Sequence, residues 1–421
     1  MTSGALSSVA APVGWSWRSL WSAMTRQKRV GQPGLRPLSV FLDAGVVPRD
    51  SRGDNHNRLG EDLAKYLVVQ PGDVVFNKLR TWQGGIGSSS YRGIVSPAYY
   101  VCRPDLGYDS RYLHYLLRST PYLAELTRIS KYMPPSQFDT PWETLRLLPI
   151  LTPPLEEQRR IADFLDAETS RIDRLVALQR QVVERLNERD AAVRDVLIDR
   201  MANRRGELPL RRFILKIEQG VSPQCESAPR QDSSEWSVLK LSAVKGGVFR
   251  PGENKLLPGG TAPSREYEVR PGDLLATRAN TPELVGDVAV VSSDCARLLL
   301  PDLIYRIGLT EAMDAEYVTQ VALGGRVRSV IEAAARGSSG SMVKLRGEDI
   351  RSWPVPPASL SEQHELVREI SLETVTTGRL RALLSRQIDL LAERRQSLIT
   401  AAVTGQFDVT TASGRNLTQG V

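Results

Sequence analysis

Two long stretches of the chain repeat apolar residues at alternating spacings of four and three, the period of helices that pair along one face. Eight of the eleven positions in the first stretch are apolar. They are Ile161, Leu165, Glu168, Ile172, Leu175, Gln179, Val182, Leu186, Arg189, Val193 and Val196. The positions in the second are Leu366, Ile370, Glu373, Thr377, Leu380, Leu384, Gln387, Leu391, Arg394, Leu398 and Ala401. The pattern predicts two long helices, residues 155–205 and 358–405, that pair as an antiparallel coiled coil.

The same polar residues interrupt both patterns at equivalent positions, Glu168 and Arg189 in the first and Glu373 and Arg394 in the second. In an antiparallel pair Glu168 would face Arg394, and Arg189 would face Glu373. Such pairs cost stability relative to apolar packing but can fix the helix register. The alternative is that all four are solvated charges at the edge of the seam.

Helices of about 40 to 45 residues would span on the order of 60 to 65 Å at 1.5 Å per residue. Such a pair would act as a ruler, because it would hold the parts of the protein at its two ends at a fixed distance. Gly378 lies inside the second helix, where glycine costs about 1 kcal/mol relative to alanine, so we expect local fraying or a bend there.

The chain contains an internal duplication. Residues 69–75, with the turn signal Pro-Gly-Asp, return as residues 269–275, and Asp73 and Asp273 give an offset of 200. From Tyr112, which returns as Tyr317, the offset is 205 and holds into both long helices. One ancestral unit of about 200 residues therefore occurs twice, because a constant register over this length is the signature of a repeat.

Each repeat begins with a globular part that mixes short strands with turn signals. The Pro-Gly-Asp turns lead into aliphatic runs that are typical of strands. Helical stretches follow at 111–130 and 316–336, and proline-rich segments end the globular parts at 148–154 and 353–357. The predicted fold is α+β with pseudo-twofold symmetry. It has a disordered N-terminus at 1–14, globular domains at 15–154 and 206–357, the two helices, and a tail at 406–421.

Composition narrows the class of protein. The apolar fraction is 41% and the charged fraction 24%, which is typical of a globular protein, and no run is long and apolar enough for a membrane helix. We therefore expect a cytoplasmic protein with no membrane partner. The net charge is +7, and the whole excess lies in residues 1–150, with 18 Lys and Arg against 11 Asp and Glu. A basic surface indicates a polyanionic partner.

The sequence offers no catalytic constellation. The histidines His56, His114 and His364 are isolated, and the three cysteines form no C-x-x-C pair. The sequence contains no phosphate loop, no motif of the kind that methyltransferases use to act on a flipped base, and no nuclease motif. We therefore expect no metal and no cofactor in this chain.

Polar loops after the Pro-Gly-Asp strands carry the side chains that base-edge reading requires. For any single position, solvated surface is the alternative to DNA contact, but the repeated placement favours DNA binding. The candidates in the first repeat are Asn77, Lys78, Arg80, Trp82, Gln83, Ser88, Ser89, Tyr91 and Arg92. Those in the second are Arg278, Asn280, Thr281, Ser339, Ser341 and Lys344.

Two segments of the long helices resemble type I restriction-modification specificity subunits. The run 153–166, with Thr169 and residues 172–175, resembles their central conserved region, and the run 393–406 resembles their C-terminal conserved region. The resemblance implies that the globular parts are target-recognition domains, each reading half of a bipartite, asymmetric site in double-stranded DNA. It also implies that the helices set the spacer and dock two methyltransferase subunits, which bind S-adenosylmethionine, in an assembly with ATP- and Mg-dependent restriction subunits. It transfers no base-contacting residue.

Two other classes of function stay open at this point. One is the recognition part of a single-chain methyltransferase or nuclease, although the absent motifs leave no segment for a catalytic domain. The other is a coiled-coil scaffold without a DNA role.

Overall fold

The computed structural model describes residues 4–53, 59–60, 62–133, 137–226, 228–282, 284–291, 295–335 and 343–409. The chain divides into two compact units, unit 1 with residues 1–179 and 385–421, and unit 2 with residues 180–384. Both units mix helices with mainly antiparallel strands, so the predicted α+β class is confirmed. None of the helices in these ranges is long and apolar enough to cross a membrane.

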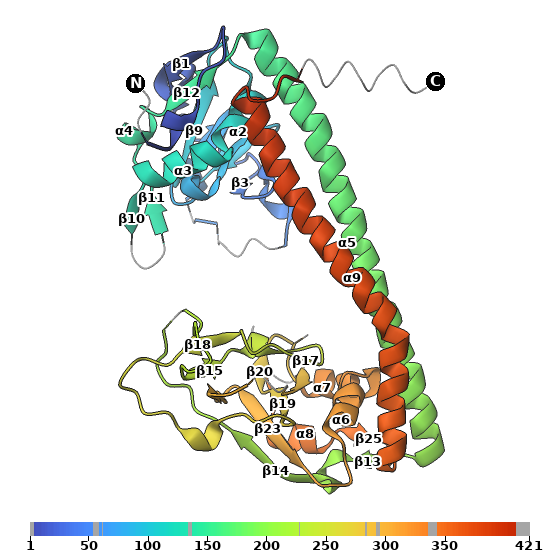
Figure 1. Cartoon of the computed structure of the whole chain (residues 1–421). Coiled ribbons are helices and arrows are strands. Elements are labelled where there is room, and N and C mark those ends of the chain that lie inside the picture. The colour runs from blue at the N-terminus through green and yellow to red at the C-terminus, as the bar shows by residue number, and fades with distance from the viewer. Residues whose placement is uncertain are drawn as a thin grey trace, which may run out of the picture. The chain divides into compact units, whose positions relative to one another are not determined.

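The two longest helices are α5 (Leu155–Arg205) and α9 (Leu360–Val403), drawn in green and red in Figure 1. The bounds of α5 are those predicted, and its 51 residues exceed the expected 40 to 45. The second helix begins two residues later and ends two residues earlier than predicted. It continues without a break through Gly378, so the fraying expected at this glycine is not found.

Each unit contains a section of both helices, and within each unit these sections run antiparallel. In unit 1, Arg395 Nε lies 3.0 Å from Asp173 Oδ1, and Gln179 Nε2 donates to Gln387 Oε1 over 3.1 Å. In unit 2, Arg200 Nη1 lies 3.5 Å from Glu369 Oε1, and residues nearer the end of α5 pair with residues nearer the start of α9. The residue numbers rise on one helix as they fall on the other, as antiparallel packing requires.

Every second inward-facing position of the helices lies one residue later than the position predicted for the seam. Ile172 is buried as predicted, but Leu175 and Val182 are each 44% exposed. The shielded positions lie one residue later, at Val176 and Val183. The spacing of four and three was predicted correctly. Leu175 and Val176 are both apolar, as are Val182 and Val183, so the pattern assigned to the seam the residue of each pair that lies on an outer face. A single partner helix shields only a narrow strip of its neighbour, so it leaves these side chains exposed.

Unit 1 is built on a four-stranded antiparallel sheet in the order β2-β9-β6-β7. Its strands are β2 (Met24–Gln27), β9 (Tyr99–Pro104), β6 (Val74–Asn77) and β7 (Ile86–Ser88). Smaller pairs surround it: β1 (Ser16–Ser19) with β12 (Pro149–Thr152), β3 (Leu38–Phe41) with β4 (Gly45–Pro48), β5 (Leu67–Val69) with β8 (Gly93–Val95), and β10 (Lys131–Met133) with β11 (Gln137–Asp139). The helical stretch predicted at 111–130 forms two helices, α2 (Ser110–Leu117) and α3 (Thr120–Ile129), with Pro121 in the first turn of α3.

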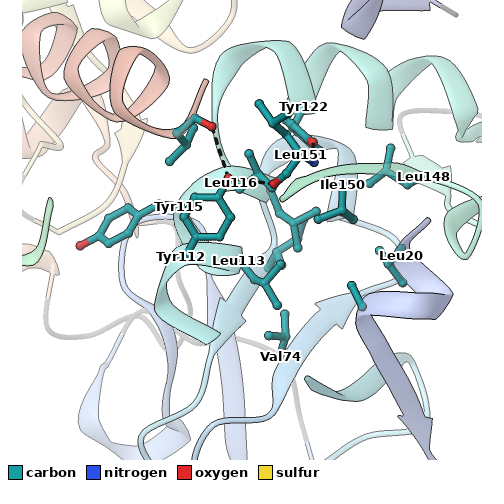
Figure 2. Packing of buried hydrophobic residues seen from close by; sticks show 14 of the residues in the cluster. Leu20, Val74, Tyr112, Leu113, Tyr115, Leu116, Tyr122, Leu148, Ile150 and Leu151 are labelled. Carbon is teal, nitrogen blue, oxygen red and sulfur yellow. Dashed lines mark hydrogen bonds between the residues drawn. The ribbon is translucent and has the colours of Figure 1, made fainter. Parts of the chain in front are cut away.

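The core of unit 1 lies between the sheet, α2, α3 and the long helices. Figure 2 shows Tyr112 and Tyr122 directed toward β12, where both are fully buried. The Tyr112 hydroxyl donates to the Leu151 carbonyl over 2.8 Å, and the Leu151 N–H donates to the Tyr122 hydroxyl over 2.9 Å. These bonds satisfy polar groups that would otherwise be buried without partners.

Unit 2 repeats this architecture. Its four-stranded sheet has the order β14-β23-β19-β21, with strands β14 (Ile214–Gln219), β23 (Ile304–Leu309), β19 (Leu274–Thr277) and β21 (Val288–Val290). The pair β13 (Leu208–Pro209) and β25 (Pro354–Val355) corresponds to β1 and β12. The helices α6 (Ala315–Ala322) and α7 (Gly325–Ala335) correspond to α2 and α3. A further sheet, β18 (Asn254–Leu256), β15 (Ser237–Leu239) and β22 (Leu298–Leu299), extends this unit.

The repeated Pro-Gly-Asp segments form the same turn in both units. Gly72 and Gly272 have φ values of +88° and +89°, a conformation that glycine adopts without strain. The carboxylates of Asp73 and Asp273 each accept a hydrogen bond from the backbone N–H three residues earlier, at 2.8 and 2.9 Å. The predicted role of these segments as turns into strands is confirmed.

Within the segment 1–14 that was predicted to be disordered, residues 4–14 are described and the disorder is not found there. A 3-10 helix, η1 (Gly4–Ser8), packs on α3, and the Ala5 N–H donates to Glu125 Oε2 over 3.0 Å. Leu6 is fully buried in the core of unit 1. The many small and polar residues of this segment concealed two apolar anchors, Leu6 and Val9. In the tail, Phe407 packs against Phe164 with ring centroids 5.6 Å apart.

Candidate nucleic-acid interface

The polar candidates of the first repeat lie at opposite ends of the β6–β7 hairpin. These strands pair with Val74 opposite Ser88 and Phe76 opposite Ile86. The loop that follows Asn77 is therefore at one end, whereas the segment that follows Ser88 lies beside the Pro-Gly-Asp turn at the other. The sequence suggested one continuous loop, but the structure separates it into two sites about four strand residues, or roughly 13 Å, apart.

Lys78 and Arg278 occupy equivalent places and are engaged within their own units. Lys78 Nζ donates to the Pro97 carbonyl over 2.6 Å and lies 4.9 Å from the ring centroid of Tyr100. Arg278 Nη1 donates to the Asp302 carbonyl over 3.3 Å and lies over the ring of Tyr305. Burial lowers the pKa of Lys78, and the nearby Arg26 adds to this shift. Both cations hold the loop against its sheet, which favours a positioning role over direct contact with bases.

The loop at the first end of the hairpin is stabilised by its own polar groups. Asn77 Oδ1 accepts from the Leu79 N–H over 3.1 Å, and Trp82 Nε1 donates to the Leu79 carbonyl over 3.2 Å. The Trp82 ring packs on Phe138, with centroids 4.7 Å apart. The side chains of Arg80 and Gln83 are exposed, and in the described part of the chain neither has a hydrogen-bond or ion-pair partner.

A surface recess of about 590 Å³ lies beside this loop within unit 1. Four of the predicted residues line it: Asn77, Arg80, Trp82 and Gln83. The recess also contains Arg49, which the sequence did not single out because it lies in a turn about 30 positions before the loop. Only the pairing of β3 with β4 and the packing of this hairpin on the sheet bring Arg49 beside Arg80.

Tyr99 lines the recess together with the two cations Arg49 and Arg80. Burial raises the pKa of Tyr99, and the positive charges of Arg49 and Arg80 oppose this shift because they favour the phenolate. Both guanidinium groups therefore act on the same hydroxyl. Among the described residues that line the recess, none is acidic.

The second end of the hairpin contributes fewer accessible groups. Ser88 Oγ donates to Ser110 Oγ over 2.8 Å. Ser89 is 2% exposed, and its hydroxyl bonds the backbone of Tyr91, so this candidate stabilises the turn and does not reach the surface. Tyr91 is 42% exposed, and Arg92 reaches Gln32 Oε1 only at 3.5 Å.

In unit 2 the structure brings part of the candidate set together. β20 (Ala279–Asn280) pairs with β24 (Val343–Lys344), which places Ala279 opposite Lys344. Lys344 and Thr281 are exposed, whereas Asn280 Oδ1 accepts from the Thr281 N–H over 2.9 Å. Ser339 and Ser341 lie outside the described residues.

The four charged residues predicted at the helix seam flank it instead. Arg189 Nη2 lies 3.6 Å from Glu373 Oε2, so this predicted pair is present, with both side chains about half exposed. Glu168 lies 4.0 Å from Arg171 of its own helix, and no ion pair between Glu168 and Arg394 occurs among the described residues. The ion pair in that region joins the next residue along α9, Arg395, to Asp173. The one-residue shift of the seam accounts for the difference.

Isolated histidines and cysteines fit structural roles. His114 is partly buried, and the loss of solvent around the ring lowers its pKa to about 3, so it is neutral at physiological pH. Cys102 and Cys295 are buried thiols. Within the described ranges, no three His, Cys, Asp or Glu side chains gather as a metal site would require, and His56 lies outside these ranges.

Comparison with known proteins places these features in a family context. No protein-family model matches the chain. It is 33% identical over 151 residues to the specificity subunit of the type I restriction enzyme EcoEI from Escherichia coli, a match that covers 35% of this chain and 25% of that protein. It is 23% identical over 362 residues to the specificity subunit of EcoKI from Escherichia coli strain K12, covering 80% and 75% of the two chains. The resemblance to type I specificity subunits is confirmed.

The fold agrees with this resemblance. A solved structure that concerns complex assembly and conformational transition of the type I R-M system contains a chain with a TM-score of 0.59 to this one. The two are 16% identical, and the match covers 94% of this chain and all of the other. At this identity the likeness concerns the fold alone.

Each long helix has near its start a buried glutamine that sequence reasoning missed, and the first lies in the run 153–166 that resembles type I specificity subunits. Gln158 of α5 is fully buried, accepts from the Asp109 N–H and donates to the carbonyls of Gly107 and Pro153. Gln363 of α9 repeats these contacts with Asp314, Ala312 and Ala358, at 2.8 Å in each case. The repeat of Gln158 at an offset of 205 was the available signal. Within each unit this amide fastens the start of a long helix to the globular part.

Proposed function

We propose that this chain is a non-catalytic, sequence-specific DNA-binding subunit that reads a bipartite, asymmetric site. Each globular part, at 15–154 and 206–357, acts as a target-recognition domain for one half-site. The similarity to proteins named as specificity subunits of type I restriction enzymes supports this proposal, as does the absence of a catalytic motif in the sequence.

The observation that carries the proposal is a repeated framework with unlike exposed loops. The sheets of the two units have the same order, and Gln158 and Gln363 make the same three hydrogen bonds. At the tip of the equivalent hairpins, however, unit 1 presents Arg80 and unit 2 presents Asn280. Side chains with different donors and acceptors recognise different base edges. Two similar supports with unlike loops are suited to two different half-sites.

The long helices, in this proposal, form an antiparallel coiled coil that sets the spacer and docks two methyltransferase subunits. Exposed leucines support two equivalent docking sites. Leu175 and Leu178 in unit 1 are 44% and 53% exposed, and their counterparts at an offset of 205, Leu380 and Leu383 in unit 2, are 42% and 61% exposed. Exposed apolar side chains three residues apart form one helix face, the kind of surface that a partner helix covers.

The chemistry of the assembly is assigned to the partners. The methyltransferase subunits would bind S-adenosylmethionine, and restriction subunits would bind ATP and Mg²⁺. This chain would supply the DNA sequence preference and the positions of the subunits.

Selection from random duplexes tests the proposal. The chain is incubated with its methyltransferase partner and a pool of random DNA, and bound DNA is recovered and sequenced. We expect two separated blocks of preferred bases with a fixed spacer. A single block, or no preference in the presence of the partner, contradicts the bipartite interpretation. Methyl transfer by the purified chain alone contradicts the non-catalytic one.

The ruler is tested separately. Inserting four residues into α5 should lengthen the preferred spacer and leave both half-sites unchanged, because a helix extends by about 1.5 Å per residue. A change in the half-sites themselves would show that the helices do not set the spacing.

A further inference from the structure

The recess beside the β6–β7 loop contains two arginines that form no ion pair with any described residue. Arg80 is exposed and Arg49 is partly buried, and neither guanidinium has a hydrogen-bond or ion-pair partner among the described residues. Each group carries five N–H donors in a planar fork that matches the oxygens of a phosphate or carboxylate. Two such groups that line one recess without an acidic neighbour among the described lining residues are arranged to receive an anion.

Neighbouring arginines show that this arrangement is particular to the recess. Arg36 Nη2 lies 2.7 Å from Asp50, and Arg52 Nη1 lies 2.7 Å from Asp43. These two arginines are therefore paired with carboxylates, whereas Arg49 and Arg80 are not paired with any described residue. Arg49 immediately precedes Asp50, yet that carboxylate is engaged by Arg36 and does not line the recess.

We propose that Arg49 and Arg80 bind phosphates of the DNA backbone, seating one strand of the duplex in this recess. The inference rests on the proposed function and deepens it by separating backbone contacts from base contacts. A recess receives a protruding part of the DNA, which is the sugar-phosphate strand, whereas base edges lie within the grooves and are reached by projecting side chains. Gln83, exposed at the rim and without a partner among the described residues, is placed to reach a base edge.

The proposal also explains where the charge excess of the chain acts. Phosphate contacts contribute affinity that does not depend on sequence, and they fix the position of a protein on the duplex. The equivalent of Arg80 in unit 2 is Asn280, which is neutral and hydrogen-bonded within its own turn. At this hairpin position unit 1 therefore has a positive charge that unit 2 lacks.

Salt-dependent DNA binding by the full chain, together with its methyltransferase partner, tests this assignment. The variants are Arg49→Ala, Arg80→Ala and the double variant, measured by fluorescence anisotropy on a selected duplex and a random duplex. Each single variant should reduce the slope of log K against log salt by about 0.9 and weaken binding on the order of tenfold. Because phosphates carry no sequence, the preference for the selected duplex should stay unchanged.

Matched variants distinguish the outcomes. Arg146→Ala removes one positive charge from the same unit, but Arg146 is paired with Glu143 outside the recess, so the slope should not change. Arg80→Lys keeps the charge and should keep the slope, and Gln83→Ala should lower the preference with the slope unchanged. A double variant that retains the wild-type slope overturns the phosphate assignment, as does an Arg80 variant that loses preference but not slope. If the unaltered assembly binds neither duplex, the proposed function itself fails and this inference fails with it.

Discussion

The two units differ in what they repeat and what they vary. Contacts that hold the fold recur: Lys78 and Arg278 each donate to a backbone carbonyl beside an equivalent tyrosine, and Gln158 and Gln363 fasten equivalent helices. Exposed positions differ, as at Arg80 and Asn280. The comparison teaches that after duplication the buried polar groups stayed under the same physical constraint in both copies. The loops were free to diverge.

Replacing the buried glutamine should have the largest effect on the free energy of unfolding, and this effect should be equal in both units. Gln158→Ala leaves one N–H and two carbonyls without their amide partner, and Gln363→Ala does the same. We expect each to lower the free energy of unfolding by about 3 to 4 kcal/mol, since each buried unsatisfied group costs about 1 to 3 kcal/mol. Urea denaturation of the full chain measures the loss, and hydrogen exchange of α2 and α6 shows which unit is affected.

A matched variant controls for the loss of an amide. Gln83 is exposed and has no partner in the described part of the chain, so Gln83→Ala should leave stability within about 0.5 kcal/mol of the original. If Gln158→Ala destabilises the chain strongly while Gln363→Ala does not, the two fastenings are not equivalent and the comparison is broken.

The helix sections of the two units should respond differently to loss of a carboxylate. In unit 2, Asp190 is 6% exposed, accepts from the Thr377 hydroxyl and lies 2.9 Å from Arg381 Nη1. In unit 1, Asp173 is 58% exposed and pairs with Arg395. Asp190→Ala should cost about 2 to 3 kcal/mol because it leaves shielded polar groups unpaired, and Asp173→Ala should cost less than about 1 kcal/mol. Equal losses in thermal and urea denaturation would contradict this distinction.

The sequence predicted the elements well where local chemistry determines them. Prolines at 148–154 fixed the start of α5, and Pro-Gly-Asp fixed the turns before β6 and β19, because these residues restrict the backbone directly. The repeat register also located equivalent positions in both units. Such signals depend on neighbouring residues and need no knowledge of the tertiary fold.

The sequence could not predict which face of each helix is shielded or which distant residues complete the recess. Leu175 and Val176 are adjacent and both apolar, so apolarity alone could not choose between them, and the structure leaves the leucine 44% exposed. A leucine on an outer helix face gives the same pattern as a leucine in the seam until its partner is known. Arg49 lines the same recess as Arg80, 31 positions later in the sequence, because the β3–β4 hairpin packs on the sheet, and no local pattern encodes this packing.

The exposed leucines test a feature that the two units share, the proposed docking site for a methyltransferase subunit. Leu178→Ser in unit 1 and Leu383→Ser in unit 2 should each weaken the binding of one methyltransferase subunit about tenfold and leave the other unchanged, because each removes an apolar contact from one of two equivalent faces. Analytical ultracentrifugation at limiting partner concentration should show complexes with one partner. Leu106→Ser, at a fully exposed position in a loop of unit 1, serves as the control. If either helix variant abolishes both binding events, the sites are not independent.

The smallest effect concerns the starts of the two long helices, where the repeats differ at the residue just before each helix. Ser359 precedes α9 and forms a capping box with Glu362, whose carboxylate accepts from the Ser359 N–H over 3.0 Å. The equivalent of Ser359 before α5 is Pro154, which has no N–H to donate. The hydrogen bond from Arg205, followed by that from Ser359, lowers the pKa of Glu362 to about 2.

This depressed pKa predicts a pH-dependent difference between unaltered protein and Glu362→Gln. A carboxyl group whose pKa is lower in the folded state stabilises it fully above its ordinary pKa of about 4.5, and the contribution is lost as pH falls toward 2. The melting temperature of Glu362→Gln should therefore lie about one degree below that of the unaltered protein at pH 6, and the gap should close by about pH 2. Other carboxylates titrate in the same range but cancel in the difference. Glu157→Gln, at the equivalent place in α5, is the matched variant because Pro154 offers no N–H to that carboxylate, and an equal gap there would mean that the hydrogen bonds to Glu362 do not distinguish the two helices.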